Sequence, residues 1–240
     1  MNPTFMLGGE LEVRRLGFGA MRVVADRDEG VRVVRRAVEL GVTLVDTADV
    51  YGAGASEEVV AEALYPYPEG VVIATKGGLG AGFQDRLRDG RPEYLRHACD
   101  ASLRRLKLER IDLYQLHRHD PEVPIEESVG ALQQLRDEGK IRLIGLSNVS
   151  LDQLRAAQAV ARIVSVQNEF SRGLLTSDDV LQACEAEGIA FIPWRPLGEG
   201  LHEPAVELRW LLDRSPVILA IPGTSKVAHL EENMRAVMTA

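Results

Sequence analysis

Four side chains in this sequence could together move a proton onto a carbonyl group: Asp46, Tyr51, Lys76 and His117. A phenol with an ordinary pKa of about 10 is a weak acid at neutral pH. An adjacent lysine ammonium favours the phenolate, a carboxylate can hold that lysine in place, and a neutral imidazole can orient the substrate oxygen. The set could protonate a carbonyl oxygen while a hydride reaches the carbon. Taken singly, each residue has a commoner structural role, such as a helix cap or a packed loop side chain.

The pattern of the chain places all four residues at one edge of a sheet. Short apolar segments bounded by glycine or proline predict eight buried parallel strands, at residues 16–19, 43–46, 71–75, 111–116, 143–146, 163–166, 189–193 and 217–221. In the segments between these strands, apolar residues recur at the spacing of an α-helix. Alternating strands and helices predict an α/β fold, a (β/α)8 TIM barrel, with its chemistry at the carboxyl ends of the strands. The four side chains fall at or just beyond such ends.

A β-hairpin is predicted ahead of the barrel. Residues 4–6 and 11–13 flank a Gly-Gly turn, and we expect the hairpin to plug the N-terminal end of the barrel. No linker or repeat beyond the βα period divides the chain, which predicts one domain over residues 1–240. A competing open sheet would need a GxGxxG turn after an early strand. Residues 77–82 lack its final glycine, so we interpret them as a mobile loop.

Local signals mark where helices begin. Pro92 and Pro124 are expected to start helices, since the missing N–H costs little in a first turn. Four polar residues are expected as N-caps: Asp28, Ser56, Ser150 and Ser177. The stretch 203–213 is long enough for one helix before the last strand.

Composition narrows the class of protein. A net charge of −8 argues against a nucleic-acid partner, because phosphate contacts need a basic face. No charged-then-apolar leader and no apolar run of about 18 residues is present, so we expect no membrane segment and a cytoplasmic location. Cys99 and Cys184 are interpreted as small core residues in a reducing compartment. Composition indicates nothing about oligomeric state.

Over nearly its whole length the chain resembles the aldo-keto reductases. The resemblance is carried by ordered segments: GVTLVDTADVYGAGASEEVVAEAL, VVIATKGG, SLRRLKLERIDLYQLHRHDP, VPIEESVGALQQLRDEGKIRLIGLSN, VSVQNEFS, GIAFIPWRPLG and IPGTSKVAHLEEN. The family's catalytic Asp, Tyr, Lys and His fall on Asp46, Tyr51, Lys76 and His117. The resemblance therefore implies reduction of an aldehyde or ketone to an alcohol, with hydride from a nicotinamide cofactor and a proton from Tyr51.

The resemblance also implies a cofactor site. Ser147, Asn148 and Gln167 would hold the nicotinamide carboxamide, and Trp194 would stack on the ring. The remaining positions would bind pyrophosphate (Leu197, Gly198), the adenosine 2′-phosphate (Gly223, Thr224, Ser225, Lys226) and adenine (Glu232, Asn233). NADPH is preferred and NADH stays possible, because His229 stands where many members carry arginine. Trp194 and Gln167 could instead be core residues at strand ends.

Two connections are shorter than is usual in the family. They follow residue 19 and residue 198, and both lie at the catalytic face. We therefore expect a more open site that retains its cofactor weakly. The substrate is a small carbonyl compound of unknown identity, and its pocket is expected to involve Val23, Val24, Tyr51, Phe83, His119 and the loop after Trp194.

Two alternative functions, from other classes of protein, remain open. His117 and His119 form an HxH at a strand end, a spacing that can bind zinc in a barrel hydrolase. That site would need further ligands from other strand ends, and we expect no metal. A non-catalytic, cofactor-binding barrel is the second alternative, although such a protein would not require the Asp, Tyr and Lys together.

Overall fold

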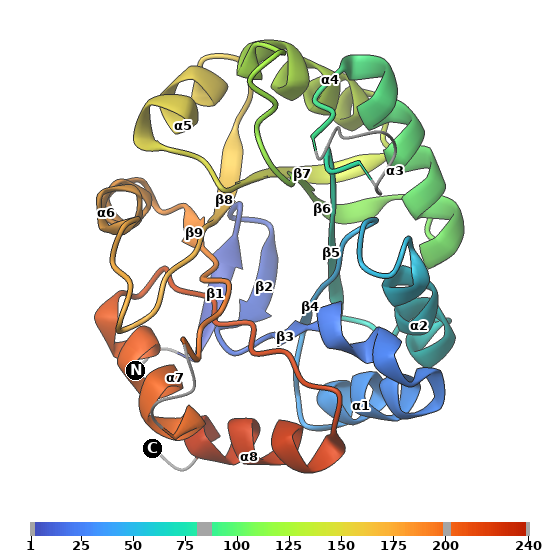
Figure 1. Cartoon of the computed structure of the whole chain (residues 1–240), viewed down its shortest axis with the longest axis vertical. Coiled ribbons are helices and arrows are strands. Elements are labelled where there is room, and N and C mark those ends of the chain that lie inside the picture. The colour runs from blue at the N-terminus through green and yellow to red at the C-terminus, as the bar shows by residue number, and fades with distance from the viewer. Residues whose placement is uncertain (1–2, 81–87, 199–202, 239–240) are drawn as a thin grey trace.

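The computed structural model describes residues 3–80, 88–198 and 203–238, which form a barrel with helices on its outside (Figure 1). A curled sheet of parallel strands makes the wall: β3 (Phe18–Gly19), β4 (Leu44–Asp46), β5 (Val72–Gly77), β6 (Ile111–Leu116), β7 (Ile141–Ser147), β8 (Ile163–Gln167) and β9 (Ala190–Phe191). The outer ring contains α1 (Arg27–Glu39), α2 (Ala55–Leu64), α3 (Pro92–Leu106), α4 (Ile125–Asp137), α5 (Leu151–Gln158), α6 (Asp178–Glu187), α7 (Pro204–Arg214) and α8 (Val227–Met238). A 3-10 helix, η1 (Ala20–Ala25), joins β3 to α1.

Residues 217–221 supply the eighth position in the barrel wall. On one side, the Leu219 N–H donates to the Phe191 carbonyl of β9 at 2.8 Å. On the other, the Gly17 N–H donates to the Ala220 carbonyl at 2.8 Å. Isolated parallel bridges accompany both contacts. The sheet order β3-β4-β5-β6-β7-β8-β9 therefore closes through this segment, and the predicted eight-stranded barrel is confirmed.

The hairpin of β1 (Thr4–Leu7) and β2 (Leu11–Arg14) lies within the ring of strands in Figure 1. Its Leu7 and Val13 are fully buried and belong to one apolar cluster with the inward side chains of the barrel strands. Gly8 sits at the tip with φ of +60°, and a Cβ there would lie 2.9 Å from the Leu143 side chain. The hairpin thus closes the N-terminal end of the barrel, as expected.

Several helix starts follow their local sequence signals. Ser150 and Gln153 form a capping box on α5: the Ser150 Oγ accepts from the Gln153 N–H at 3.2 Å, and the Gln153 side chain accepts from the Ser150 N–H at 2.9 Å. Pro92 is the first residue of α3, and Pro124 immediately precedes α4. The one helix expected near residues 203–213 is present as α7.

Two of the other expected caps, Asp28 and Ser56, are wrong. The cap of α1 is Asp26, whose carboxylate accepts from the Glu29 N–H at 3.0 Å, and Asp28 lies inside the helix. Ser56 lies inside α2, whose cap is Gly54, and its hydroxyl is hydrogen-bonded to Thr47 Oγ1 and to the Ala20 carbonyl of η1. Ser177 occupies the cap position of α6 without a side-chain cap bond. Within the described ranges, no helix combines the length and apolar character needed to cross a lipid bilayer.

Candidate active site

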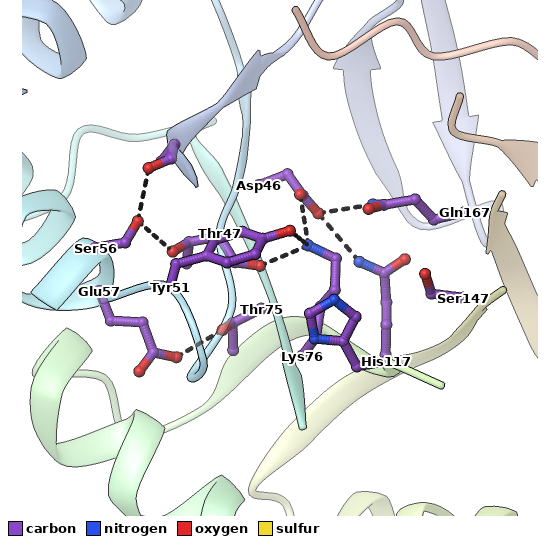
Figure 2. Close-up of polar contacts among 12 residues, drawn as sticks. Asp46, Thr47, Tyr51, Ser56, Glu57, Thr75, Lys76, His117, Ser147 and Gln167 are labelled. Carbon is purple, nitrogen blue, oxygen red and sulfur yellow. Dashed lines mark hydrogen bonds and ion pairs between the residues drawn. The ribbon is translucent and has the colours of Figure 1, made fainter. Parts of the chain in front are cut away.

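The predicted catalytic side chains converge at the carboxyl ends of β4, β5 and β6 (Figure 2). Lys76 is fully buried, and its Nζ donates to Asp46 Oδ1 at 2.6 Å and to the Thr47 carbonyl at 2.7 Å. The same Nζ lies 3.4 Å from the Tyr51 hydroxyl oxygen. The His117 ring meets the Tyr51 ring edge-on, with centroids 5.8 Å apart. The structure therefore brings together all four residues selected from the sequence.

Strand alternation explains why these side chains meet. Successive side chains of a strand point to opposite faces, so residues two apart share a face. Leu44 of β4 and Ala74 of β5 belong to the apolar cluster inside the barrel. Two positions further along each strand lie Asp46 and Lys76, one layer nearer the mouth. The interior therefore changes from apolar to charged within two residues of each strand.

Two glutamine amides bind the second oxygen of Asp46. Gln115 Nε2 of β6 donates to Asp46 Oδ2 at 3.1 Å, and Gln167 Nε2 of β8 donates to it at 3.0 Å. A Cβ on Gly145 of β7 would lie 2.9 Å from the Gln115 side chain, so glycine leaves the room that this amide needs. Gln115 was missed from the sequence, where its only signal is its place two residues before His117. Gln167 was expected at the nicotinamide carboxamide, and in the structure its amide anchors the Asp46 carboxylate.

The charges of the site follow from burial and from close partners. Burial alone would lower the pKa of Lys76, but the Asp46 carboxylate and the Tyr51 oxygen outweigh it, so this pKa is raised. Burial lowers the pKa of His117 to about 2, and the nearby Lys76 and Arg118 charges add to this effect. The ammonium is therefore charged and the imidazole neutral throughout the physiological pH range.

A buried network behind β5 supports the same strands. Thr75 of β5 donates to Glu57 Oε1 at 2.6 Å, and the other carboxylate oxygen of Glu57 accepts from Arg105 Nε at 2.6 Å. Glu57 is fully buried at the start of α2. Ser56, beside it, donates to the Ala20 carbonyl at 2.8 Å. These bonds tie β5, α2, α3 and η1 together behind Lys76.

Asp49 lies in this region and is expected to make stability depend on pH. Burial, together with the negative charge of Glu57, raises its pKa from 3.8 to about 7. The unfolded chain releases this proton near pH 4, whereas the folded protein keeps it until about pH 7. The folded state therefore loses stability as the pH rises from 4 to 7. Asp49→Asn, which cannot ionise, should gain stability relative to wild type across that window and hold the gain above it.

Urea denaturation at several pH values between 4.5 and 8 measures this difference. Asp137→Asn is the matched control, because it makes the same substitution at an exposed position at the end of α4. Parallel stability profiles for wild type and Asp49→Asn would show that Asp49 ionises normally in the folded protein.

A cavity of about 540 Å³ opens above the buried lysine. This volume lies in the range of small-molecule sites. Its wall contains three of the predicted catalytic residues and most of those assigned to the cofactor: Asp46, Tyr51, His117, Ser147, Asn148, Gln167, Trp194, Leu197, Gly198 and Gly223. The structure thus places one end of the predicted cofactor site directly beside the Lys76 pair.

Asn148 links three parts of the cavity wall. Its Oδ1 accepts from the Trp194 indole N–H at 3.0 Å, and its Nδ2 donates to the His117 carbonyl at 3.1 Å and to the Ser147 Oγ at 2.9 Å. Its φ of +56° is the left-handed conformation that asparagine tolerates better than most residues. Asn148 therefore fixes the indole and the loop that follows His117.

The remaining predicted cofactor residues lie around the start of α8. Thr224 Oγ1 accepts from the Lys226 N–H at 3.1 Å, which orders the turn before the helix. Ser225 belongs to the same turn. Further along α8, Glu232 is exposed and lines a shallow depression with His229, whereas Asn233 is buried.

The expected substrate wall is partly wrong. The 3-10 geometry of η1 turns Val23 into the core, and Met21 and Arg22 line the cavity in its place. Val24 and His119 are not part of the described cavity wall, and Phe83 lies outside the described residues. In the ranges that the structure describes, no three His, Cys, Asp or Glu side chains are grouped to hold a metal ion. The described residues therefore offer no support for the zinc hydrolase alternative.

The chain folds as a closed barrel with a buried lysine–aspartate pair beneath a tyrosine and a neutral histidine. Its sequence matches the model of the aldo/keto reductase family, and the chain belongs to that family. The match covers residues 15–207. Among its relatives, an uncharacterized oxidoreductase of Schizosaccharomyces pombe is 43% identical over 95% of this chain and 83% of its own length. The pyridoxine 4-dehydrogenase of Escherichia coli K12 is 38% identical over 97% of this chain and 92% of its own.

A solved structure supports the same family assignment as these two relatives. An aldo/keto reductase of Klebsiella pneumoniae, in complex with NADP and acetate, superimposes with a TM-score of 0.82 at 27% identity, over 98% of this chain and 90% of the other. The protein is therefore an NAD(P)H-dependent oxidoreductase of the aldo/keto reductase family.

Proposed function

We propose that this protein reduces an aldehyde or ketone to the alcohol, with NADPH as the preferred reductant and Tyr51 as the proton donor. The observation that carries the proposal is the fully buried Lys76 ammonium, which lies between the Asp46 carboxylate and the Tyr51 hydroxyl beneath an open cavity. A cofactor-binding barrel without turnover has no need for a buried cation beside a phenol.

Each residue has a role that follows from its contacts. The substrate oxygen accepts a proton from Tyr51, and the Lys76 ammonium stabilises the negative charge left on the phenolate. Asp46 and the Thr47 carbonyl hold the ammonium in place. His117 stays neutral, so it orients the carbonyl as a hydrogen-bonding group and adds no positive charge.

The residues present fit a nicotinamide cofactor, which supplies the hydride when it is bound. The cavity wall offers the Trp194 ring, the Gln167 side chain and the Ser147 hydroxyl within one surface. A Cβ on Gly223 would lie 2.7 Å from the Gly19 carbonyl, so these two backbones approach closely at one of the positions expected to bind the 2′-phosphate. Lys226 and the first N–H groups of α8 are suited to a 2′-phosphate. These features support NADPH over NADH.

The proposal is tested by a screen of carbonyl compounds with NADPH and with NADH, together with the binding of each cofactor. Pyridoxal belongs in the panel because of the relative named for pyridoxine. We expect turnover of aldehydes, with NADPH favoured in kcat/KM. Because the connections after residues 19 and 198 are short, fluorescence quenching should give a Kd for NADPH above the low nanomolar range. No turnover of any aldehyde would refute the proposed activity, and a low-nanomolar Kd would refute the expectation of an open cofactor site.

A further inference from the structure

The cavity above Lys76 carries a surplus of positive charge. Its wall contains three arginines, Arg22, Arg118 and Arg195, but a single carboxylate, Asp46. Asp46 is already paired with Lys76 at 2.6 Å. The described wall therefore favours an anion, although the whole protein has a net charge of −8.

Only one of these arginines is paired with an acid. Arg195 Nη1 lies 3.2 Å from Glu169 Oε1. Within residues 3–80, 88–198 and 203–238, the guanidinium groups of Arg22 and Arg118 have no hydrogen bond and no ion pair. Arg118 is partly buried, and a guanidinium carries five N–H donors. Such a group in a cavity wall is suited to bind a carboxylate or a phosphate, which accept its paired N–H groups.

The position of Arg118 separates it from the proposed cofactor site. Arg118 follows His117 at the end of β6, and its carbonyl lies against Gly78 in the loop after β5. The proposed cofactor residues follow β7, β8 and β9 or lie around the start of α8. Arg22, in η1, approaches from the β3 side, next to the segment that carries Gly223. Of the two unpaired arginines, Arg118 is therefore the one next in sequence to His117, the residue proposed to orient the substrate carbonyl.

Apolar side chains complete this half of the cavity. Leu79, just after β5, and Met21 of η1 line the same cavity wall as the two unpaired arginines. Met21 has about half of its surface exposed. A substrate here meets an apolar surface for its body and a guanidinium for one substituent.

We infer that the substrates of this enzyme are aldehydes or ketones that carry an anionic group, a carboxylate or a phosphate, held by Arg118 with Arg22 across the mouth. The inference rests on the proposed carbonyl reduction and names its substrate class. Because the anion is bound both before and during proton transfer, Arg118 contributes mainly to KM and less to kcat.

The test compares matched substrates at saturating NADPH. The carboxylate arm pairs 4-carboxybenzaldehyde with benzaldehyde, and the phosphate arm pairs glyceraldehyde 3-phosphate with glyceraldehyde. We expect the charged member of at least one pair to have the higher kcat/KM by about 10–100-fold, the range of a charge-assisted hydrogen bond. The arm with the larger ratio identifies the anion. The ratio should fall between 20 mM and 200 mM NaCl, because salt screens this attraction.

Arg118→Gln should reduce the charged-to-neutral ratio by at least about tenfold, through KM, and Arg22→Gln should reduce it less. The matched control is Arg104→Gln, an exposed arginine in the last turn of α3, which should leave the ratio unchanged. The Kd of NADPH, measured separately by fluorescence, should stay within about twofold in Arg118→Gln.

Three results would overturn the inference. The first is equal use of charged and neutral members while benzaldehyde is still reduced, which would leave the proposed activity intact. The second is an equal loss on both members of a pair in Arg118→Gln. The third is a loss of NADPH affinity in that variant, which would assign Arg118 to the cofactor. Failure to reduce any aldehyde would instead refute the proposed function itself.

Discussion

Tyr51→Phe is expected to lower kcat/KM for carbonyl reduction by about 10²–10⁴-fold, the contribution of a positioned general acid. The variant keeps the ring and its edge contact with His117, and it loses only the oxygen that lies 3.4 Å from Lys76 Nζ. The loss should appear in kcat, because the proton is transferred in the transition state. Steady-state oxidation of NADPH with a reactive aldehyde measures it.

Tyr65→Phe is the matched control for this change. Tyr65 is exposed at the end of α2, and removal of its hydroxyl should leave both kinetics and stability unchanged. The Kd of NADPH should be similar in wild type and in Tyr51→Phe. Full activity in Tyr51→Phe would mean that another group protonates the substrate.

Lys76→Met is expected to destabilise the fold as well as remove activity. The substitution nearly preserves volume, but it leaves the Asp46 carboxylate buried without a cation and the Thr47 carbonyl without a donor. Removal of one partner of a buried ion pair costs about 3–5 kcal/mol in the free energy of unfolding. Urea denaturation at pH 7 should show this loss, and it should shrink at acidic pH as protons neutralise the stranded carboxylate.

A double variant separates charge from packing. In Asp46→Leu with Lys76→Met no isolated charge remains, so part of the lost stability should return. Recovery should be incomplete, because Gln115 and Gln167 would each lose the acceptor of a buried hydrogen bond. If Lys76→Met alone were as stable as wild type, the buried pair would have no role in holding the fold.

The sequence predicts the barrel and the shared edge at which Asp46, Tyr51, Lys76 and His117 meet, because both depend on local patterns. Asp46, Lys76 and His117 follow runs of apolar residues, and strand direction then decides which edge they share. Gln115 was missed for the opposite reason. A glutamine within an apolar strand has no motif, and its role depends on a carboxylate 69 positions earlier in the chain.

Other features depend on packing between distant elements. The raised pKa of Asp49 requires its burial and the nearby charge of Glu57 on α2, which no local pattern of residues indicates. The expectation for Val23 was wrong because six residues formed a 3-10 helix, which turned this side chain inward. The segment 217–221 was correctly predicted to complete the wall, although it does so through isolated bridges and not as a regular strand.

The single carboxylate of Asp46 receives hydrogen bonds from side chains of β5, β6 and β8, although it stands on β4. These bonds connect β4 across the barrel interior to β6 and β8 as well as to its neighbour β5, so they hold the strand ends together at the barrel mouth. They lie below the loops and use none of their residues. The loops that carry neither Tyr51 nor His117 can therefore change in length without shifting Asp46 or Lys76, and at those loops this chain should accept grafts from longer relatives as a scaffold for new substrate specificities.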